Sequence, residues 1–324
     1  MIHFAVIGTG WISEAFVQAA HQTGKMQLQA VYSRSLESAL EFGQPFGVNL
    51  YYTDLNELAE DTSIDAVYIA SPNAMHCEQS VLMMEHGKHV ICEKPIASNI
   101  REAEFMDEVA ERRQVVCMEA YRSGYLPNFA QIRAAMEKTG PVNKAFFNYC
   151  QYSSRYDKYL QGENPNTFNP AFSNGSVMDI GFYPLAAAVA LFGRPESVKA
   201  EGQLLASGVD GEGSLLLRYP QLTVVIQHSK ISDSVIPSEI QGQNGTIVID
   251  HIADIQSVSV RYRDGQTEEL TVSQHELGMF YEADFFADAV IHQQLPDRKE
   301  TLLISELLTD IRQQLGVVYP ADKA

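Results

Sequence analysis

Continuous apolar runs that alternate with amphipathic segments fill the first 120 residues, and no other feature constrains the fold as strongly. The apolar runs are Ile2–Ile7, Leu28–Tyr32, Ala66–Ala70, Val90–Cys92 and Val115–Met118. The segments with helical spacing are Ile12–Ala20, Leu36–Phe42 with Ser35 as its cap, His76–His86 and Ile100–Arg113. Strands that are apolar throughout and are separated by helices are typical of a parallel sheet covered on both faces. We therefore predict a doubly wound α/β domain over residues 1–120.

Residues 121–324 predict a second α/β domain, built on an open and mostly antiparallel sheet. Helices are expected at Pro127–Lys138, Val177–Gly193, Met279–Gln293 and Glu300–Leu315. Strands are expected at Ala145–Tyr149, Val198–Leu205, Ser214–Tyr219, Thr223–His228, Ile236–Gln241, Thr246–Ile249, Val258–Tyr262 and Glu268–Val272. The polar, aromatic and Asn/Pro-rich stretch Ser153–Ser173 suits a long loop near a site better than a core element.

Composition and charge narrow the class of protein. A length of 324 residues suits two domains, and the net charge of −18 opposes nonspecific binding to nucleic acid, which needs a basic surface. No apolar run approaches the roughly 20 residues of a membrane helix. The N-terminus lacks the basic segment and the cleavage site of a signal peptide. We therefore expect a cytoplasmic protein that binds neither membrane nor nucleic acid.

The cysteines and histidines give no sign of a metal site. Cys77, Cys92, Cys117 and Cys150 form no CxxC pair, and the histidines are scattered without ligand spacing. We expect free, mostly buried thiols and no metal.

The segment VIGTGWIS has the strand–turn–helix context of a dinucleotide fingerprint. Gly8 allows the tight turn, and Gly10 lets the backbone approach a pyrophosphate at the helix N-terminus. Ser13 replaces the third glycine and is small enough for close helix–strand packing. A GxG pattern is weak by itself, and a plain turn is the alternative. Its place after an N-terminal apolar strand favours a dinucleotide site in a Rossmann domain.

The end of the second apolar run bears on which dinucleotide binds. A NAD site usually has an acid there for the ribose 2′-hydroxyl, whereas an arginine accommodates a 2′-phosphate. This chain has Ser33 and Arg34 and no acid. The pattern favours NADP over NAD, with a solvated surface arginine as the alternative.

Residues 71–97, SPNAMHCEQSVLMMEHGKHVICEKPIA, carry the most specific pattern in the chain. Pro72-Asn73, His76 and Glu93-Lys94-Pro95 resemble the Gfo/Idh/MocA family, which includes glucose–fructose oxidoreductase and inositol dehydrogenase. The resemblance spans nearly the whole chain and includes GSVMDIGFYPL at residues 175–185 and GVVY at residues 316–319.

The resemblance implies that Pro72 and Asn73 border the nicotinamide and that Glu93-Lys94-Pro95 lies at the catalytic centre. Ligands bind at the carboxyl ends of strands in a doubly wound sheet, so Lys94 is expected to face the cleft; a surface lysine is the alternative. His76 is expected to hold backbone rather than to react, and the Lys94–Pro95 bond is a candidate for the cis form. The residues expected at the cofactor are Gly8, Gly10, Trp11, Ile12, Ser33, Arg34, Ser71, Pro72, Asn73, His76, Glu93, Lys94, Tyr121 and Arg122.

Tyr183, in GSVMDIGFYPL, stands where most family members have a histidine. This departure resembles the branch of glucose–fructose oxidoreductase and dihydrodiol dehydrogenase, and it implies a catalytic tyrosine; a packed structural tyrosine is the alternative. On one helix, Asp179 and Tyr183 would share a face. Asp179 is expected to orient Tyr183 or Lys94, or to bind a substrate hydroxyl. Its alternative role is a carboxylate at a helix N-terminus.

A lysine and a tyrosine together suit the proton transfer that accompanies hydride transfer. A tyrosine with an ordinary pKa of about 10 is a poor base near neutrality, and a nearby ammonium favours the phenolate. The ammonium of Lys94 could instead donate to the substrate oxygen, so both assignments of the proton stay open.

These features predict an oxidoreductase that uses NADP, or else NAD, and acts on a CH–OH carbon of a sugar, polyol or cyclic diol. One alternative is a non-catalytic NAD(P)-sensing regulatory protein of the same fold. Another is a reductase of a larger unsaturated ligand such as a bile pigment. The sequence identifies neither the physiological substrate nor the reaction direction.

Two strands of the second domain also predict self-association. The runs LLLRY and LTVVI are apolar on both faces, and Leu215, Leu217, Val224 and Ile226 are expected to point outward from the sheet. Related oligomers pair through this sheet, so we expect at least a homodimer.

Overall fold

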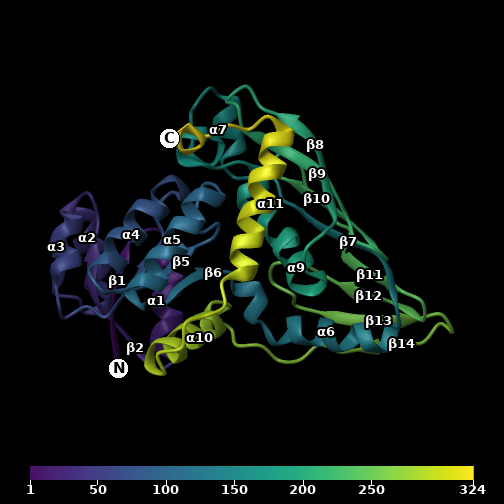
Figure 1. Cartoon of the computed structure of the whole chain (residues 1–324), viewed down its shortest axis with the longest axis horizontal. Coiled ribbons are helices and arrows are strands. Elements are labelled where there is room, and N and C mark those ends of the chain that lie inside the picture. Colours follow the sequence, from purple (N-terminus) through teal and green to yellow (C-terminus); the bar gives the residue numbers. More distant parts are fainter. Residues whose placement is uncertain (324) are drawn as a thin grey trace. The chain divides into compact units, whose positions relative to one another are not determined.

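In the computed structural model, which describes residues 1–323, the five N-terminal apolar runs and one further short strand form a six-stranded sheet in the order β3-β2-β1-β4-β5-β6 (Figure 1). The strands are β1 (Ile2–Ile7), β2 (Met26–Tyr32), β3 (Leu50–Tyr52), β4 (Ala66–Ile69), β5 (His89–Glu93) and β6 (Cys117–Ala120). All neighbouring pairs are parallel. This strand order reverses beside β1, as in a Rossmann fold, so the predicted doubly wound sheet is confirmed.

Helices connect these strands. They are α1 (Trp11–Gln22), α2 (Leu36–Gly43), α3 (Leu55–Glu60), α4 (His76–Glu85) and α5 (Ile100–Arg113). Ser35 caps α2 by accepting a hydrogen bond from the Ser38 N–H, as predicted. β3 and α3 were not expected, because β3 is a three-residue strand without a fully buried side chain and α3 has only six residues.

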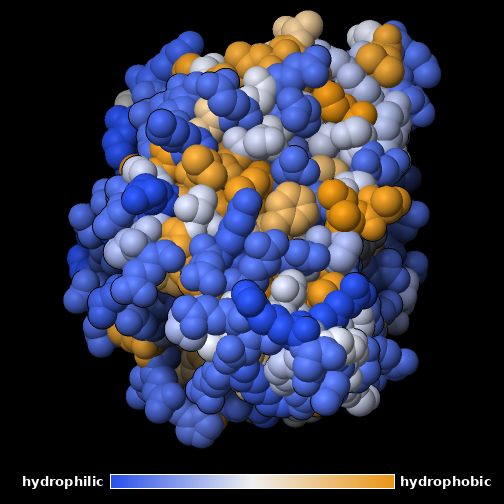
Figure 2. Space-filling model, turned by 90° about the vertical axis from the view of Figure 1, so that its right-hand side faces the viewer, coloured by the Kyte–Doolittle hydropathy of each residue, from blue (hydrophilic) through white to orange (hydrophobic). Residues whose placement is uncertain are grey.

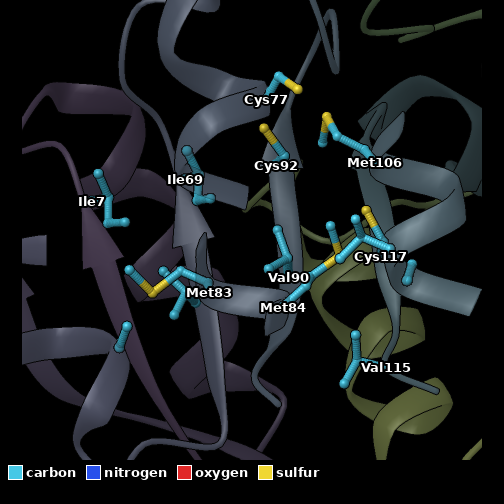
Figure 3. Close-up of a cluster of buried hydrophobic side chains, with 14 of the residues drawn as sticks. Ile7, Ile69, Cys77, Met83, Met84, Val90, Cys92, Met106, Val115 and Cys117 are labelled. Atoms are coloured by element: carbon cyan, nitrogen blue, oxygen red, sulfur yellow. The ribbon is translucent and has the colours of Figure 1, made fainter. Parts of the chain in front are cut away.

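The core of this sheet is made by the residues that give the strands their apolar character. Figure 3 shows Ile7, Ile69 and Val90 from adjacent strands facing Met83 of α4. All four side chains are at most 1% exposed. The same cluster includes three of the cysteines, and all four cysteines are free thiols, as predicted: Cys77, Cys92 and Cys117 are buried and Cys150 is partly buried.

The chain forms two compact units, and the first of them takes in a distant segment. Met1–Tyr121 is joined by His275–Leu302, whereas the second unit comprises Arg122–Gln274 and residues 303–323. The distant segment contains α10 (Phe280–Ile291), which packs against α1. Lys25 links the two stretches of the first unit, with its Nζ 2.7 Å from Asp284 and 2.8 Å from Asp288.

The second unit is built on an eight-stranded sheet in the order β14-β13-β12-β11-β7-β10-β9-β8. The strands are β7 (Val142–Cys150), β8 (Ser197–Leu204), β9 (Asp210–Arg218), β10 (Thr223–Ser229), β11 (Ser238–Gly242), β12 (Gly245–Ile249), β13 (Val258–Tyr262) and β14 (Thr267–Glu269). Only β7 and β10 pair in parallel among the strands of this part of the structure. The prediction of a mostly antiparallel sheet is confirmed.

Helices cover one face of this sheet and leave the other open, as Figure 1 shows. α6 (Pro127–Thr139) contacts β11, β12 and β13, and α9 (Phe182–Phe192) contacts β7 and β10. Figure 2, which views the side where these strands lie in Figure 1, shows apolar patches separated by polar ones.

The expected outward side chains of this sheet were assigned to the wrong face. Leu215, Leu217, Val224 and Ile226 are at most 1% exposed and lie under the helices, whereas Leu216 is 44% exposed. The error has a physical cause: side chains alternate with a period of two, and a run that is apolar on both faces does not reveal which set points inward.

The expected helix Val177–Gly193 is two helices in the structure. α8 (Ser176–Asp179) ends before Ile180 and Gly181, and α9 begins at Phe182. Asp179 and Tyr183 therefore do not share one helical face. A Cβ on Gly181 would lie 2.8 Å from the backbone of Val177, so the break depends on a residue without a side chain.

The long polar stretch has more structure than expected. It contains α7 (Tyr156–Leu160) and two short 3₁₀ turns, and Phe168 is fully buried against Tyr156 and Tyr159. The chain ends with α11 (Lys299–Leu315) and a 3₁₀ turn. Across residues 1–323, no single helix is long and apolar enough to cross a membrane, although the bent pair Pro170–Asp179 and Phe182–Phe192 passes that test by length and composition.

Candidate functional site

Most of the residues expected at the cofactor lie at or just after the ends of strands of the first sheet, whereas Arg122 belongs to the second unit. Gly8 follows β1, Ser33 follows β2, Ser71–Asn73 follows β4, Lys94 follows β5 and Tyr121 follows β6. Because these strands are parallel, their carboxyl ends meet at one edge, where ligands bind in doubly wound sheets. The structure therefore brings these residues to the same edge of the first unit.

The first glycine turn fits a dinucleotide. Gly8 has a φ of +106°, and a Cβ on it would lie 2.7 Å from the carbonyl oxygen of Ala70, so this turn requires glycine. A Cβ on Gly10 would meet nothing within 4 Å, so the backbone borders open space there. Trp11 and Ile12 begin α1, whose first turn has no side-chain cap. Its N–H groups and the positive end of the helix dipole suit a pyrophosphate.

The end of β2 presents an exposed arginine. The Ser33 N–H donates to the carbonyl oxygen of Tyr52 at 3.1 Å, which fixes the end of β2 beside the end of β3. Arg34 follows with an exposed side chain. A guanidinium at this position suits a phosphate group, for which it supplies several donors.

His76 links the loops that follow β4 and β5. Its Nδ1 lies 2.9 Å from the carbonyl oxygen of Pro95, and its Nε2 lies 2.9 Å from that of Ser71. Burial lowers the pKa of His76, so the neutral ring donates to one of these carbonyls. The Lys94–Pro95 peptide bond between them is cis. This arrangement agrees with a role in holding backbone.

Lys94 lies between two anchored neighbours. On one side, the Tyr68 hydroxyl donates to Oε1 of Glu93 at 2.6 Å. On the other side, the Ile96 N–H donates to Oε1 of Glu119 at 2.8 Å. The residues that flank Lys94 are therefore held, Glu93 through its side chain and Ile96 through its backbone N–H.

Glu119 is a residue that sequence reasoning missed. It is 5% exposed, and burial raises its pKa to about 7. The hydrogen bond from the Ile96 N–H acts in the opposite direction and lowers this pKa. A signal was present, since Glu119 is a charged residue within the otherwise apolar strand β6 (CMEA).

In the second unit, Asp179 is the last residue of α8, and its carboxylate forms an ion pair with Lys230, which follows β10. Lys230 was not expected at the site. Its only sequence signal is a lysine directly after an apolar strand, which is the same signal that Lys94 gives.

Tyr183 begins a row of contacting side chains that leads to Arg122. The ring centroids of Tyr183 and Tyr149 lie 5.7 Å apart, and those of Tyr149 and His251 lie 4.6 Å apart. Nδ1 of His251 lies 3.6 Å from Asp254, which also forms an ion pair with Arg122. Tyr183 and Arg122, which were predicted from the sequence, are thus connected through three residues that were not predicted: Tyr149, His251 and Asp254.

A buried polar cluster fixes the start of α8. The Ser176 hydroxyl lies 2.8 Å from Nδ1 of His228, and the Val177 N–H donates to Asp210 at 2.7 Å. Burial raises the pKa of Asp210 to about 7 and lowers that of His228 to about 3. Gly175 has a φ of +146°, and a Cβ on it would lie 2.4 Å from Asp210. Because these side chains are at most 1% exposed, the cluster supports the start of α8 from within the fold.

The sequence-predicted catalytic residues belong to different units. Lys94 lies in the first unit, and Asp179 and Tyr183 lie in the second. Among the residues described here, no group of three or more His, Cys, Asp or Glu side chains is arranged to hold a metal ion.

Comparison with protein families identifies the two parts of the chain. The oxidoreductase family with an NAD-binding Rossmann fold, GFO_IDH_MocA, matches residues 2–121, and the GFO/IDH/MocA C-terminal domain matches residues 131–248. The chain belongs to the Gfo/Idh/MocA oxidoreductase family. It is an NAD(P)-dependent oxidoreductase, and the family resemblance predicted from the sequence is confirmed.

Relatives cover this Gfo/Idh/MocA protein from end to end. It is 53% identical over 324 residues to the uncharacterized oxidoreductase YgjR of Escherichia coli (strain K12), with 99% of each chain covered. It is 48% identical over 328 residues to scyllo-inositol 2-dehydrogenase (NADP(+)) IolU of Bacillus subtilis (strain 168), with 100% of each chain covered. The 3-ketoreductase KijD10 of Actinomadura kijaniata, solved with NADP and TDP-benzene, shares the fold with a TM-score of 0.85 at 22% identity, over 98% of this chain and 99% of that one.

Proposed function

We propose that this protein is an NADP-preferring dehydrogenase that interconverts a ring hydroxyl and a ketone on a cyclic polyol or a related sugar. The observation that carries the proposal is the 48% identity, over the full length of both chains, to a scyllo-inositol 2-dehydrogenase that uses NADP(+). A match over both chains includes the second unit, in which we expect the substrate-binding residues.

The choice of NADP is supported by the end of β2. Arg34 is exposed there, directly after Ser33, and no acid follows the strand to bind a ribose 2′-hydroxyl. A guanidinium gains charge-assisted hydrogen bonds from a 2′-phosphate that NAD lacks.

We assign the proton to Lys94 and Tyr183 acting together. NADP(+) would supply the hydride acceptor when bound. The ammonium of Lys94 would polarise the reacting oxygen, and the Tyr183 hydroxyl group would relay the proton from the substrate hydroxyl. Hydrogen bonds to the Glu93 side chain and to the Ile96 N–H, on either side of Lys94, support this role, since catalytic groups must be held in fixed positions.

Steady-state assays test this function. The wild type is expected to reduce NADP(+) with scyllo-inositol, with a higher kcat/KM than with NAD(+), followed by absorbance of the reduced nicotinamide. Lys94→Ala and Tyr183→Phe should each lower kcat by about 10²–10⁴-fold. The double variant should lose much less than the product of both losses, because the two residues act as a unit.

Matched controls are Lys299→Ala, at a lysine that is 89% exposed, and Tyr262→Phe, which removes a hydroxyl bonded to Glu268 far along the sheet. Both should keep wild-type kcat. Near-normal turnover of Lys94→Ala would contradict the assignment. A folded wild type that binds NADP and turns over no polyol, sugar or diol would favour the NAD(P)-sensing regulatory protein instead.

A further inference from the structure

Lys230 is a buried lysine whose charge is paired with a proposed site residue. Its side chain is 9% exposed and forms an ion pair with Asp179, whose side chain is 32% exposed. Burying an ammonium is unfavourable without an anionic partner, and Asp179 supplies one. The pair is therefore buried on the lysine side and accessible on the carboxylate side.

The backbone of Lys230 is fixed on both sides. Its N–H donates to the carbonyl oxygen of Gly211 in β9 at 2.9 Å. Its carbonyl oxygen accepts a hydrogen bond from the Ser153 N–H at 2.9 Å, at the start of the 153–173 segment. The ammonium thus extends from a rigid point where β10 ends, and it holds the end of α8.

Tyr149, whose ring contacts that of Tyr183, lies near the carboxyl end of β7, beside the end of β10. β7 and β10 run in parallel, and Tyr149 of β7 pairs with His228 of β10, two residues before Lys230. The Tyr149 ring contacts that of Tyr183. The carboxyl ends of these two strands therefore bring together the lysine that holds Asp179 and the aromatic ring that contacts Tyr183.

Stability alone does not account for this ion pair. Replacing a buried pair with apolar residues of similar size is often neutral or stabilising, so such a pair is weak support for a purely structural role. A carboxylate held in its ionised form is an acceptor only, which matches the hydroxyl donors of a polyol ring.

We propose that Lys230 is a positioning residue that holds Asp179 as an anion, oriented to accept a hydrogen bond from a hydroxyl of the substrate ring. The inference rests on the proposed function and names a residue that determines affinity for its substrate class. Lys230 itself does not touch the reacting atoms, and it acts through Asp179.

Kinetics of Lys230 variants with scyllo-inositol and NADP(+) test the inference. Lys230→Met keeps the apolar stem and should raise KM for the polyol about ten- to a hundredfold, the loss expected for one hydrogen bond to a charged group, with a smaller change in kcat. Lys230→Arg should restore most of the affinity. In an Asp179→Asn background, Lys230→Met should cause little additional loss, because the two residues would act on one hydrogen bond. Lys299→Met, at an exposed ion pair with Asp297, is the matched control and should change nothing.

Thermal unfolding and NADP binding, followed by fluorescence of Trp11, are measured on every variant. If Lys230→Met does not fold, Lys230→Gln takes its place and should show an intermediate rise in KM. An active wild type with unchanged KM in a folded Lys230 variant would overturn the inference and leave the proposed function intact. A full additional loss in the Asp179→Asn background, or no restoration by arginine, would also overturn it. A wild type without turnover would defeat the proposed function and this inference with it.

Discussion

Arg34 is the side chain that we expect to decide between NADP and NAD. Arg34→Ala should remove most of the preference for NADP(H) and leave NAD(H) affinity nearly unchanged. The reason is that NAD lacks the 2′-phosphate that Arg34 is expected to bind. Losing one charge-assisted contact is worth about 1.5–3 kcal/mol, or roughly ten- to a hundredfold in affinity. Titration of both cofactors against wild type and variant measures this. Equal wild-type affinities for the two cofactors would contradict it.

Glu119 should make the stability of the first unit depend on pH. Burial raises its pKa from 4.5 to about 7, so the folded state holds a proton between these values that the unfolded state releases. The resulting stabilisation is full below about pH 4.5 and is lost as the pH rises through 7. It amounts to about 3 kcal/mol.

Glu119→Gln should remove this dependence, because an amide can still accept the Ile96 N–H and does not titrate. Urea unfolding followed by circular dichroism at pH 5 and pH 8 measures the effect. The free energy of unfolding of the wild type should fall between these pH values relative to Glu119→Gln. Glu111→Gln, at an exposed glutamate of α5, should behave as the wild type does. Parallel pH profiles for wild type and Glu119→Gln would show that Glu119 does not titrate in this range.

At the scale of elements, the two glycines of the turn between β1 and α1 are expected to have different roles: Gly8 in stability and Gly10 in cofactor binding. Gly8→Ala places a side chain at a φ of +106° and 2.7 Å from a backbone oxygen, so it should destabilise the protein by about 1–3 kcal/mol. Gly10→Ala places its Cβ in open space and should leave stability unchanged. It should still weaken NADP binding by about tenfold or more, because the pyrophosphate would have to occupy that space.

Trp11 allows the binding to be measured directly. It is the one tryptophan in the sequence, it is 76% exposed, and it follows Gly10. Its fluorescence should change when NADP binds to the wild type. Normal affinity in Gly10→Ala would contradict a pyrophosphate at this turn.

At the scale of the whole molecule, we expect at least a dimer that buries the open face of the second sheet. On that face Leu216 pairs with Val225, and Val225 pairs with Phe146. Lys199 and Glu239 are the next residues on either side of this apolar row. Leu216 is exposed and Val225 and Phe146 are partly exposed, and apolar side chains of this kind mark interfaces when they adjoin polar residues.

Light scattering on material from size-exclusion chromatography tests the assembly. The wild type should be at least a dimer at micromolar concentration. Leu216→Glu should shift it towards the monomer, because it replaces the most exposed side chain of the apolar row with a charge. Phe105→Glu, at a residue of α5 that is 47% exposed, is the control and should leave the mass unchanged. A monomeric wild type would contradict the prediction.

The sequence by itself determined the parts of this protein whose signal is local. All-apolar strands, helix caps and the GTG turn are encoded in neighbouring residues, and so five of the six strands of the first sheet, α5 and the cap at Ser35 could be predicted. Candidate site residues could be proposed where a strand ends in an unusual residue, as at Gly8 and Lys94. The family pattern added Asp179 and Tyr183, whose chemistry no local signal would have identified.

Only the tertiary structure decided the features that depend on pairs distant in the sequence. The packing of separate segments decides three such features: which leucines of β9 point inward, where the chain breaks between α8 and α9, and the ion pair of Lys230 with Asp179. Glu119 became identifiable as a titrating group only when its burial against the Ile96 backbone was known. Local propensity and periodicity are properties of a few adjacent residues, whereas burial and electrostatic pairing arise only when the folded chain brings distant residues together.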